Sequence, residues 1–120
     1  MNLTRENHDK FVVWGFGDQM RDFIHMDDCI AGVLKTKGKI SDGSAINLST
    51  GILTSFKEFA RLVLDEVGQS KLPIRGSSTK SEGVFARGGD TPLQKELGYS
   101  HSIDFSSGIK RALGYLERLF

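Results

Sequence analysis

The chain has 120 residues, enough for one domain of ordinary size. Its 16 basic and 15 acidic residues give a net charge of +1, which argues against a nucleic-acid partner, since non-specific binding to nucleic acid usually needs a basic excess. One cysteine, Cys29, excludes an internal disulfide and a multi-cysteine zinc site. We expect no membrane partner and a cytoplasmic location, because no apolar run is long enough to span a bilayer and the N-terminus lacks the apolar core of a signal peptide.

The first elements read as a polar lead-in followed by a β-hairpin. Residues 1–10 are polar, and the folded domain is expected to cover residues 11–120. Residues 11–14 (F-V-V-W) are apolar, β-branched and aromatic, as is typical of a strand. The glycines of residues 15–18 favour a turn, and residues 21–25 alternate well enough to form the returning strand.

A helix is expected next, beginning at Asp27 or Asp28, because a carboxylate at the N-cap accepts hydrogen bonds from the first helical turn. It ends at Gly38, and its apolar residues Ile30, Val33 and Leu34 fall on one side. Residues 44–48 (S-A-I-N-L) predict a further strand.

The most regular segment is residues 55–67. Ser55 and Glu58 have the spacing of a capping box, which marks a helix start. The apolar residues that follow form one continuous stripe, at positions Phe56, Phe59, Ala60, Val63, Leu64 and Val67. We interpret this stripe as core, and Gly68 ends the helix.

The last third begins with a short strand at residues 72–75. Residues 76–89 form a long, polar, glycine-rich loop, which in a compact domain is usually functional or mobile. A short helix follows from Thr91 and Pro92, and Asp104 caps the last helix. The inward face of that helix is expected to comprise Phe105, Ile109, Leu113, Leu116 and Phe120. The chain is therefore α/β (mixed α+β), with short strands and four helices.

Four sequence blocks occur in order over about residues 11–117. They are W-G-x-G-x-x-x-R-D-F-I-H-M-D-D, N-L-S-T-G-x-L-T-S-F-K-E-F-A, K-S-E-G-V-F-A-R-G-G-D-T-P-L-Q-K-E-L-G-Y and I-D-F-S-S-G-I-K-R-A-L. Together they resemble the C-terminal part of the NAD-dependent epimerase/dehydratase family, the extended short-chain dehydrogenases/reductases that act on nucleotide sugars. The resemblance implies a single substrate-side domain, the C-terminal fragment of a Rossmann-type fold.

The resemblance also implies two motifs that the 120 residues do not contain. The family binds NAD or NADP at a G-x-x-G-x-x-G turn, but the glycines at residues 15–17 lack a third partner. The family's catalytic Tyr-x-x-x-Lys is absent as well, since Tyr99 and Tyr115 are followed four positions later by Ile103 and Leu119. We therefore expect this chain to have no cofactor site, no catalytic residue and no activity of its own.

Arg21 is the leading candidate for binding. In the resemblance it matches the arginine that contacts the diphosphate of a nucleotide sugar, and a planar guanidinium suits phosphate oxygens. The alternative is a strand arginine paired with Asp18 or Asp22.

Two further basic residues, Arg87 and Lys80, flank Gly83 in the long loop. Family members often carry basic residues here that close over the sugar nucleotide, and Ala86 takes one of the two positions where such a residue falls. The alternative is a solvated, mobile loop.

Other reactive residues have simpler interpretations. His25 has no second histidine at metal-ligand spacing, so we assign it a structural role and expect no metal site. Asp27 and Asp28 are read as a helix cap, and Cys29 as a half-buried thiol. Trp14 either covers a neighbouring domain or stacks on a ligand base, and covering is favoured.

Three functions stay open. The first is a stand-alone or truncated C-terminal domain that retains contacts to a UDP- or GDP-sugar and forms a homo-oligomer, because an apolar face and a sheet edge would be exposed. The second is one half of a split enzyme, whose dinucleotide-binding half is a separate chain. The third is a small oligomeric binding or scaffold module.

Overall fold

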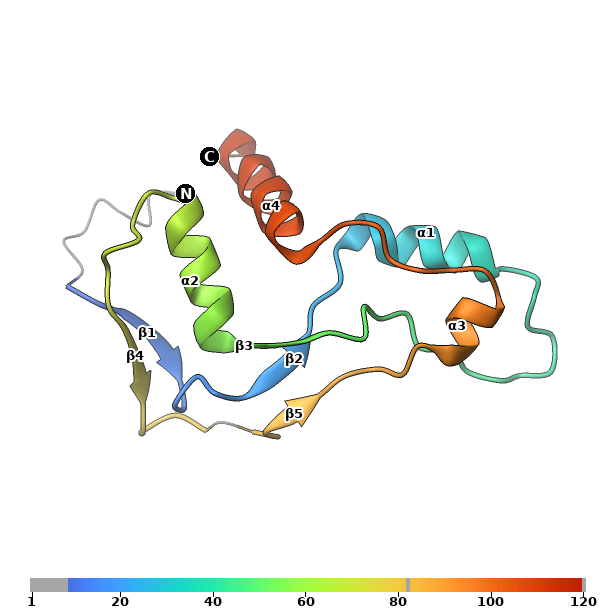
Figure 1. Cartoon of the computed structure of the whole chain (residues 1–120), viewed down its shortest axis with the longest axis horizontal. Helices are drawn as coiled ribbons and strands as arrows, with labels where there is room; N and C mark the ends of the chain where they lie inside the picture. The colour runs from blue at the N-terminus through green and yellow to red at the C-terminus, as the bar shows by residue number, and fades with distance from the viewer. Residues whose placement is uncertain (1–8, 82, 120) are drawn as a thin grey trace.

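The computed structural model describes residues 9–81 and 83–119, which form four helices and five short strands (Figure 1). The strands are β1 (Phe11–Trp14), β2 (Met20–Asp22), β3 (Leu53–Ser55), β4 (Ile74–Ser77) and β5 (Ala86–Arg87). The helices are α1 (Met26–Thr36), α2 (Phe56–Glu66), α3 (Pro92–Glu96) and α4 (Phe105–Leu119). The mixed α/β class with four helices is thus confirmed. Most of the lead-in at residues 1–10, and Phe120 at the end, lie outside the described residues.

The strands form two small sheets. β1 pairs in parallel with β4, and β2 lies between β3, which is antiparallel to it, and β5, which is parallel. The predicted β-hairpin is therefore wrong, because β1 and β2 belong to different sheets. After β1 the chain keeps following β4, with Gly15 O accepting from Ser77 N at 2.7 Å. A Cβ at Gly76 would lie 2.5 Å from Gly15 O, so this close pairing needs glycine.

The molecule is elongated, with extents of 53 × 33 × 18 Å. Figure 1 shows β1, β4, α2 and α4 at one end and α1 with α3 at the other, with β2 and β3 between them. No helix among the described residues is long and apolar enough to cross a membrane.

The packed core lies where α2 and α4 meet the segment after β2. The Phe23 ring stacks on Phe105 with centroids 5.1 Å apart, and lies 4.9 Å from Phe59 and 5.8 Å from Phe56. Such ring pairs add to the free energy of apolar burial. The α2 prediction is confirmed, since Ser55 Oγ accepts from Glu58 N at 3.1 Å.

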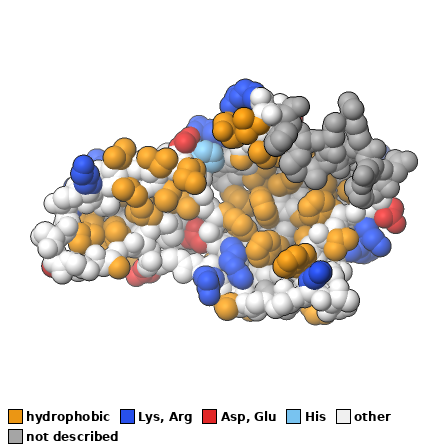
Figure 2. Space-filling model, turned by 180° about the vertical axis from the view of Figure 1, so that it is seen from behind, with side chains coloured by type: hydrophobic (Ala, Val, Ile, Leu, Met, Phe, Trp, Pro, Cys, Tyr) orange, Lys and Arg blue, Asp and Glu red, His pale blue; other side chains and the backbone are white. Residues whose placement is uncertain are grey.

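Two features distinguish the α1 end, and the second corrects a prediction. The apolar side of α1 faces outward, with Ile30 51% and Leu34 68% exposed, and Figure 2 shows hydrophobic side chains spread over this end. Residues 44–48 are not a strand, because no strand of the described chain lies beside them to complete a ladder. Both features lie on a surface that this chain alone leaves uncovered.

Candidate functional site

Arg21 stands in the middle of β2, at the centre of its sheet. Its Nη1 donates to Met20 O at 2.7 Å and to Val84 O at 2.9 Å. The guanidinium carbon lies 5.7 Å from the centroid of the Phe56 ring, within cation–π range. The side chain is half-buried, and the two carbonyls and the Phe56 ring restrict its position.

Neither aspartate proposed as an alternative partner pairs with Arg21. Asp18 accepts from Lys57 Nζ at 2.8 Å. Asp22 accepts from Thr50 N, from Thr50 Oγ1 and from Gly51 N at 2.6–3.0 Å. Within the described residues, the contacts of the guanidinium are therefore backbone carbonyls and an aromatic ring.

Arg21 forms part of the wall of a cavity of about 490 Å³. The wall is otherwise mainly apolar and comprises Phe11, Val13, Trp14, Gln19, Phe56, Phe59, Ala60, Val63 and Ser81. A mostly apolar hollow with a few polar groups is the usual form of a small-molecule site.

Gln19 adds a polar group to the same wall that the sequence analysis did not single out. Its Nε2 donates to Trp14 O at 2.9 Å, whereas its buried Oε1 has no hydrogen-bond partner in the described chain. An unpaired buried acceptor is uncommon and costs about 1–3 kcal/mol, so Gln19 is a further candidate polar group at this cavity.

Arg87 lies beside Arg21, whereas Lys80 lies over Trp14, another residue of the cavity wall. Arg87 lies opposite Arg21 in the parallel β2–β5 pair, so both side chains leave the same face of the sheet. Lys80 Nζ instead lies 5.5 Å from the centroid of the Trp14 ring, which is 66% exposed. The long loop that the sequence predicts thus contains a short strand, β5.

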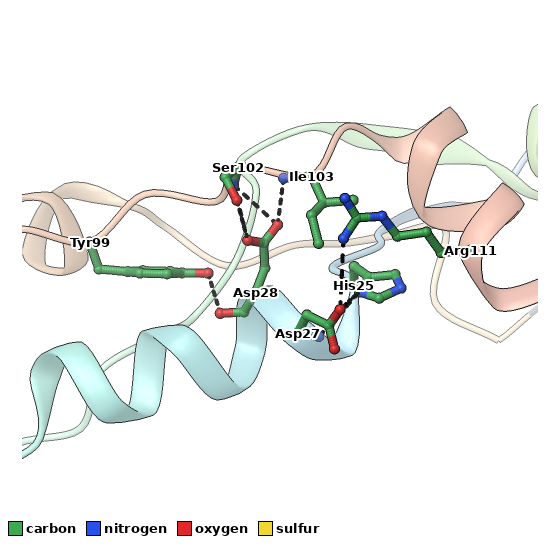
Figure 3. Close-up of polar contacts among 7 residues, drawn as sticks. All are labelled: His25, Asp27, Asp28, Tyr99, Ser102, Ile103 and Arg111. Carbon is green, nitrogen blue, oxygen red and sulfur yellow. Dashed lines mark hydrogen bonds and ion pairs between the residues drawn. The ribbon is translucent and has the colours of Figure 1, made fainter. Parts of the chain in front are cut away.

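Asp28 is a second charged centre, and it is not the helix cap. Its carboxylate accepts from Ser102 N at 3.1 Å, from Ser102 Oγ at 2.9 Å and from Ile103 N at 2.8 Å, and its carbonyl accepts from Tyr99 Oη at 2.6 Å (Figure 3). We call this set the Asp28 clasp. It fastens the start of α1 to the segment between α3 and α4.

Burial acts to raise the pKa of the Asp28 carboxyl, but the amides of Ile103 and Ser102, the Ser102 hydroxyl and the nearby His101 together lower it below its ordinary value. The Tyr99 pKa is raised above its ordinary value of 10.0, mainly by burial and also by the electrostatic effect of Asp28 and Cys29. The clasp therefore holds an ionised carboxylate beside a neutral phenol.

The N-cap of α1 is His25, whose Nδ1 accepts from Asp27 N at 3.1 Å. The Asp27 carboxylate lies 3.7 Å from the same nitrogen and 3.8 Å from Arg111 Nη1 on α4 (Figure 3). The prediction of an aspartate cap is wrong, because the N-cap lies two positions before Asp27 and three before Asp28. Across the described ranges, no three histidine, cysteine or acidic side chains gather as a metal site.

A search against family models finds no match. The chain is 35% identical to GDP-mannose 3,5-epimerase of Arabidopsis thaliana over 85% of its own length and 26% of that protein. It is 28% identical to GDP-L-fucose synthase of Escherichia coli K12 over 88% of its length and 36% of that protein. The chain thus spans about a third of the curated relatives it matches.

Solved structures agree with these relatives. A GDP-6-OMe-4-keto-L-xylo-heptose reductase from Campylobacter jejuni superposes with a TM-score of 0.78 at 29% identity, over 91% of this chain and 34% of that one. UDP-glucose 4-epimerase from Thermotoga maritima gives a TM-score of 0.80 at 22% identity, over 92% and 35%, which speaks for the fold. In each of these comparisons, most of this chain matches about a third of a longer protein or less.

Proposed function

We propose that this chain, which belongs to the extended short-chain dehydrogenase/reductase family and matches its C-terminal portion, holds the diphosphate of a nucleotide sugar. The relatives carry GDP-sugars and UDP-sugars in their names. Arg21 and Arg87 are the residues assigned to the phosphates.

One observation carries the proposal. Arg21 and Arg87 stand opposite each other on one face of β2–β5, and no acidic partner of either occurs in the described part of the chain. Like charges directly opposite on neighbouring strands destabilise a sheet unless an anion lies between them. A diphosphate supplies that anion, and guanidinium groups bind its oxygens in pairs.

The cavity beside Arg21 fits the rest of such a ligand. Its volume of about 490 Å³ and its phenylalanine-rich wall offer an apolar surface to a sugar or a base. Trp14 stands at this wall with Lys80 over its ring, so the base-stacking role for Trp14 stays open beside the covering role.

Catalysis is not assigned to these residues. Tyr99 is buried in the Asp28 clasp and Tyr115 is exposed on α4, where Arg118 lies 6.0 Å from its ring. Neither tyrosine belongs to a Tyr-x-x-x-Lys pair. We propose that NAD or NADP and the catalytic residues belong to a dinucleotide-binding portion, on the same polypeptide or on a separate chain.

The outward apolar side of α1 supports association. Met26, Ile30, Val33 and Leu34 are each more than half exposed. A patch of this kind is costly in water and usually marks a protein contact. We propose that α1 packs against the dinucleotide-binding portion, and that the 120 residues alone cover it by forming a homo-oligomer.

Calorimetry tests the proposal directly. The 120-residue chain is titrated with GDP-mannose, UDP-glucose and guanosine, and we expect binding of a diphosphate sugar but not of the nucleoside. Arg21→Ala and Arg87→Ala should each weaken binding about tenfold or more, since a charge-assisted hydrogen bond contributes about 1.5–3 kcal/mol. Arg75→Ala, on exposed β4, is the matched control and should bind as the unmodified chain does.

Two results would overturn the proposal: no binding of any nucleotide sugar, or full affinity in the Arg21→Ala variant. Light scattering on the same samples gives the mass, and a monomer at micromolar concentration would contradict the association of the α1 faces.

A further inference from the structure

We infer that Arg21 works in two directions at once: one guanidinium nitrogen latches residues 83–85 onto β2, while the opposite edge of the same group receives the diphosphate. Ligand binding and closure of the β2–β5 pair are then coupled through a single side chain. The ligand half of this inference rests on the proposed function, whereas the latch stands on geometry alone.

The donor count of Arg21 makes both contacts possible together. A guanidinium has five N–H donors, of which Nη1 carries two. Two carbonyl oxygens accept from Nη1: Met20 O at 2.7 Å and Val84 O at 2.9 Å. Among the described residues, no acceptor binds the three donors of Nη2 and Nε, which form the planar edge that takes two oxygens of one anion.

The segment that Arg21 holds has few other attachments. Val84 is 52% and Phe85 64% exposed, so apolar burial adds little. β5 has two residues. Among the described residues, Met20 N also donates to Phe85 O at 2.6 Å, and within the loop Gly83 N donates to Ser81 Oγ at 3.2 Å. Segments with few buried contacts open at low free-energy cost, so one hydrogen bond is a large share of what keeps this one closed.

Gly83 lies near the guanidinium in a backbone conformation that favours glycine. Its φ is +67°, and a Cβ there would lie 4.0 Å from Arg21 Nη2. A residue with a side chain would be strained at that φ, although the space itself is sufficient. Gly83→Ala therefore loosens the segment without removing any donor of Arg21.

The coupling follows because the anion and the Val84 carbonyl both fix the orientation of the same guanidinium group. An anion on the Nη2 and Nε edge fixes the orientation of the guanidinium, which lowers the entropy cost of the Nη1 bond to Val84 O. By linkage, a closed segment raises the affinity for the anion by the same factor that the anion stabilises closure.

Amide hydrogen exchange measured by NMR separates the two halves. The reporter is the Met20 amide, which donates to Phe85 O in the closed pair. Arg21→Lys keeps the charge and loses the fork, so exchange of this amide without ligand should rise about tenfold, the loss of roughly one hydrogen bond. Arg75→Lys is the matched control and should leave the rate unchanged.

With saturating nucleotide sugar, exchange of the Met20 amide should slow further in the unmodified chain and not in Arg21→Lys. Gly83→Ala should weaken nucleotide-sugar binding several-fold with Arg21 intact. Gly43→Ala, at a glycine with a φ of +82° in open space, has the same backbone strain away from the site and should bind normally.

An unchanged Met20 rate in Arg21→Lys overturns the latch whether or not the ligand binds. Absence of binding in the unmodified chain overturns the proposed function and the ligand half, while a raised rate in Arg21→Lys then still supports the latch. Should Arg21→Lys fail to fold, the Gly83→Ala and Gly43→Ala pair decides alone: equal affinities contradict the coupling.

Discussion

Arg21 and Asp28 lie seven positions apart, yet the chain treats their charges in opposite ways. Asp28 is 3% exposed, and both of its oxygens accept from groups of the same chain. Arg21 is half-buried, directs one nitrogen to two carbonyls and stands at a cavity wall. The contrast indicates that a charge whose hydrogen bonds are all made within its own chain serves stability, whereas a charge with donors left over is the one we propose for binding.

The same contrast divides the two ends of the molecule. At the α1 and α3 end, buried polar groups join distant segments: besides the Asp28 clasp, Gln94 receives a bond from Ser49 N and donates to Ser49 O, each at 2.9 Å. At the α2 end, packed rings support a cavity. We expect substitutions at the first end to change stability, and those around Arg21 to change binding.

The largest effect is expected for Asp28→Ala. Removing the carboxylate leaves the amides of Ser102 and Ile103 without their acceptor, and the free energy of unfolding should fall by at least about 3 kcal/mol. Urea unfolding measures it. Asp27→Ala, at the exposed neighbour, is the control and should cost less than about 1 kcal/mol. Equal losses in the two variants would break the contrast between a fastening and a surface charge.

Gln94→Leu should follow with a loss of about 2 kcal/mol, because it leaves the backbone N–H and C=O of Ser49 without their Gln94 partners in a buried place. Gln94 is 1% exposed, whereas Gln69 is exposed and serves as the matched position for Gln69→Leu. Thermal unfolding followed by circular dichroism would show the difference. A Gln94→Leu variant as stable as Gln69→Leu would mean that this bond is not part of the fastening.

The smallest effect concerns acid. The folded pKa of Asp28 is depressed, so its contribution to stability is fully present above its ordinary value of 3.8 and is lost as the pH falls through the lower folded value. Asp28→Asn should flatten the decline in stability below that pH. Asp42 and Asp104 also have lowered pKa values, through hydrogen bonds from Ser44 and Ser107, so part of the decline should persist. An unaltered acid profile in Asp28→Asn would contradict this role.

Local patterns in the sequence anticipate elements whose signals are local. The α2 stripe and its Ser55 cap are found where the spacing predicts them, and Asp104 accepts from Ser107 N at 3.0 Å at the start of α4. These features depend on residues three or four positions apart, which a periodic pattern reports directly.

Features that depend on distant partners were missed. An aspartate at a helix start has the same sequence signature whether it caps its own helix or, like Asp28, accepts from Ser102 seventy-four positions away. The pairing of β2 with β5 could not be read from F-A-R-G, because two residues give no alternation. Arg21 was identified through resemblance, and its bond to Val84 O depends on a loop path that no local pattern encodes.

The parallel pairing of β1 with β4 has a consequence for the order of folding. It joins Phe11 to Ile74, so a long stretch of chain that includes α1 and α2 must be brought back before the pair can form. Non-local contacts of this kind form slowly, because the entropy of closing the intervening chain is lost before the contacts are gained. Phe11, Val13 and Trp14 of β1 also line the Arg21 cavity, so we expect the cavity to mature with the last steps of folding. A nucleotide sugar added during refolding would then bind only after the cavity is complete. The onset of binding would report the last steps of folding, and the ligand would not speed the earlier ones.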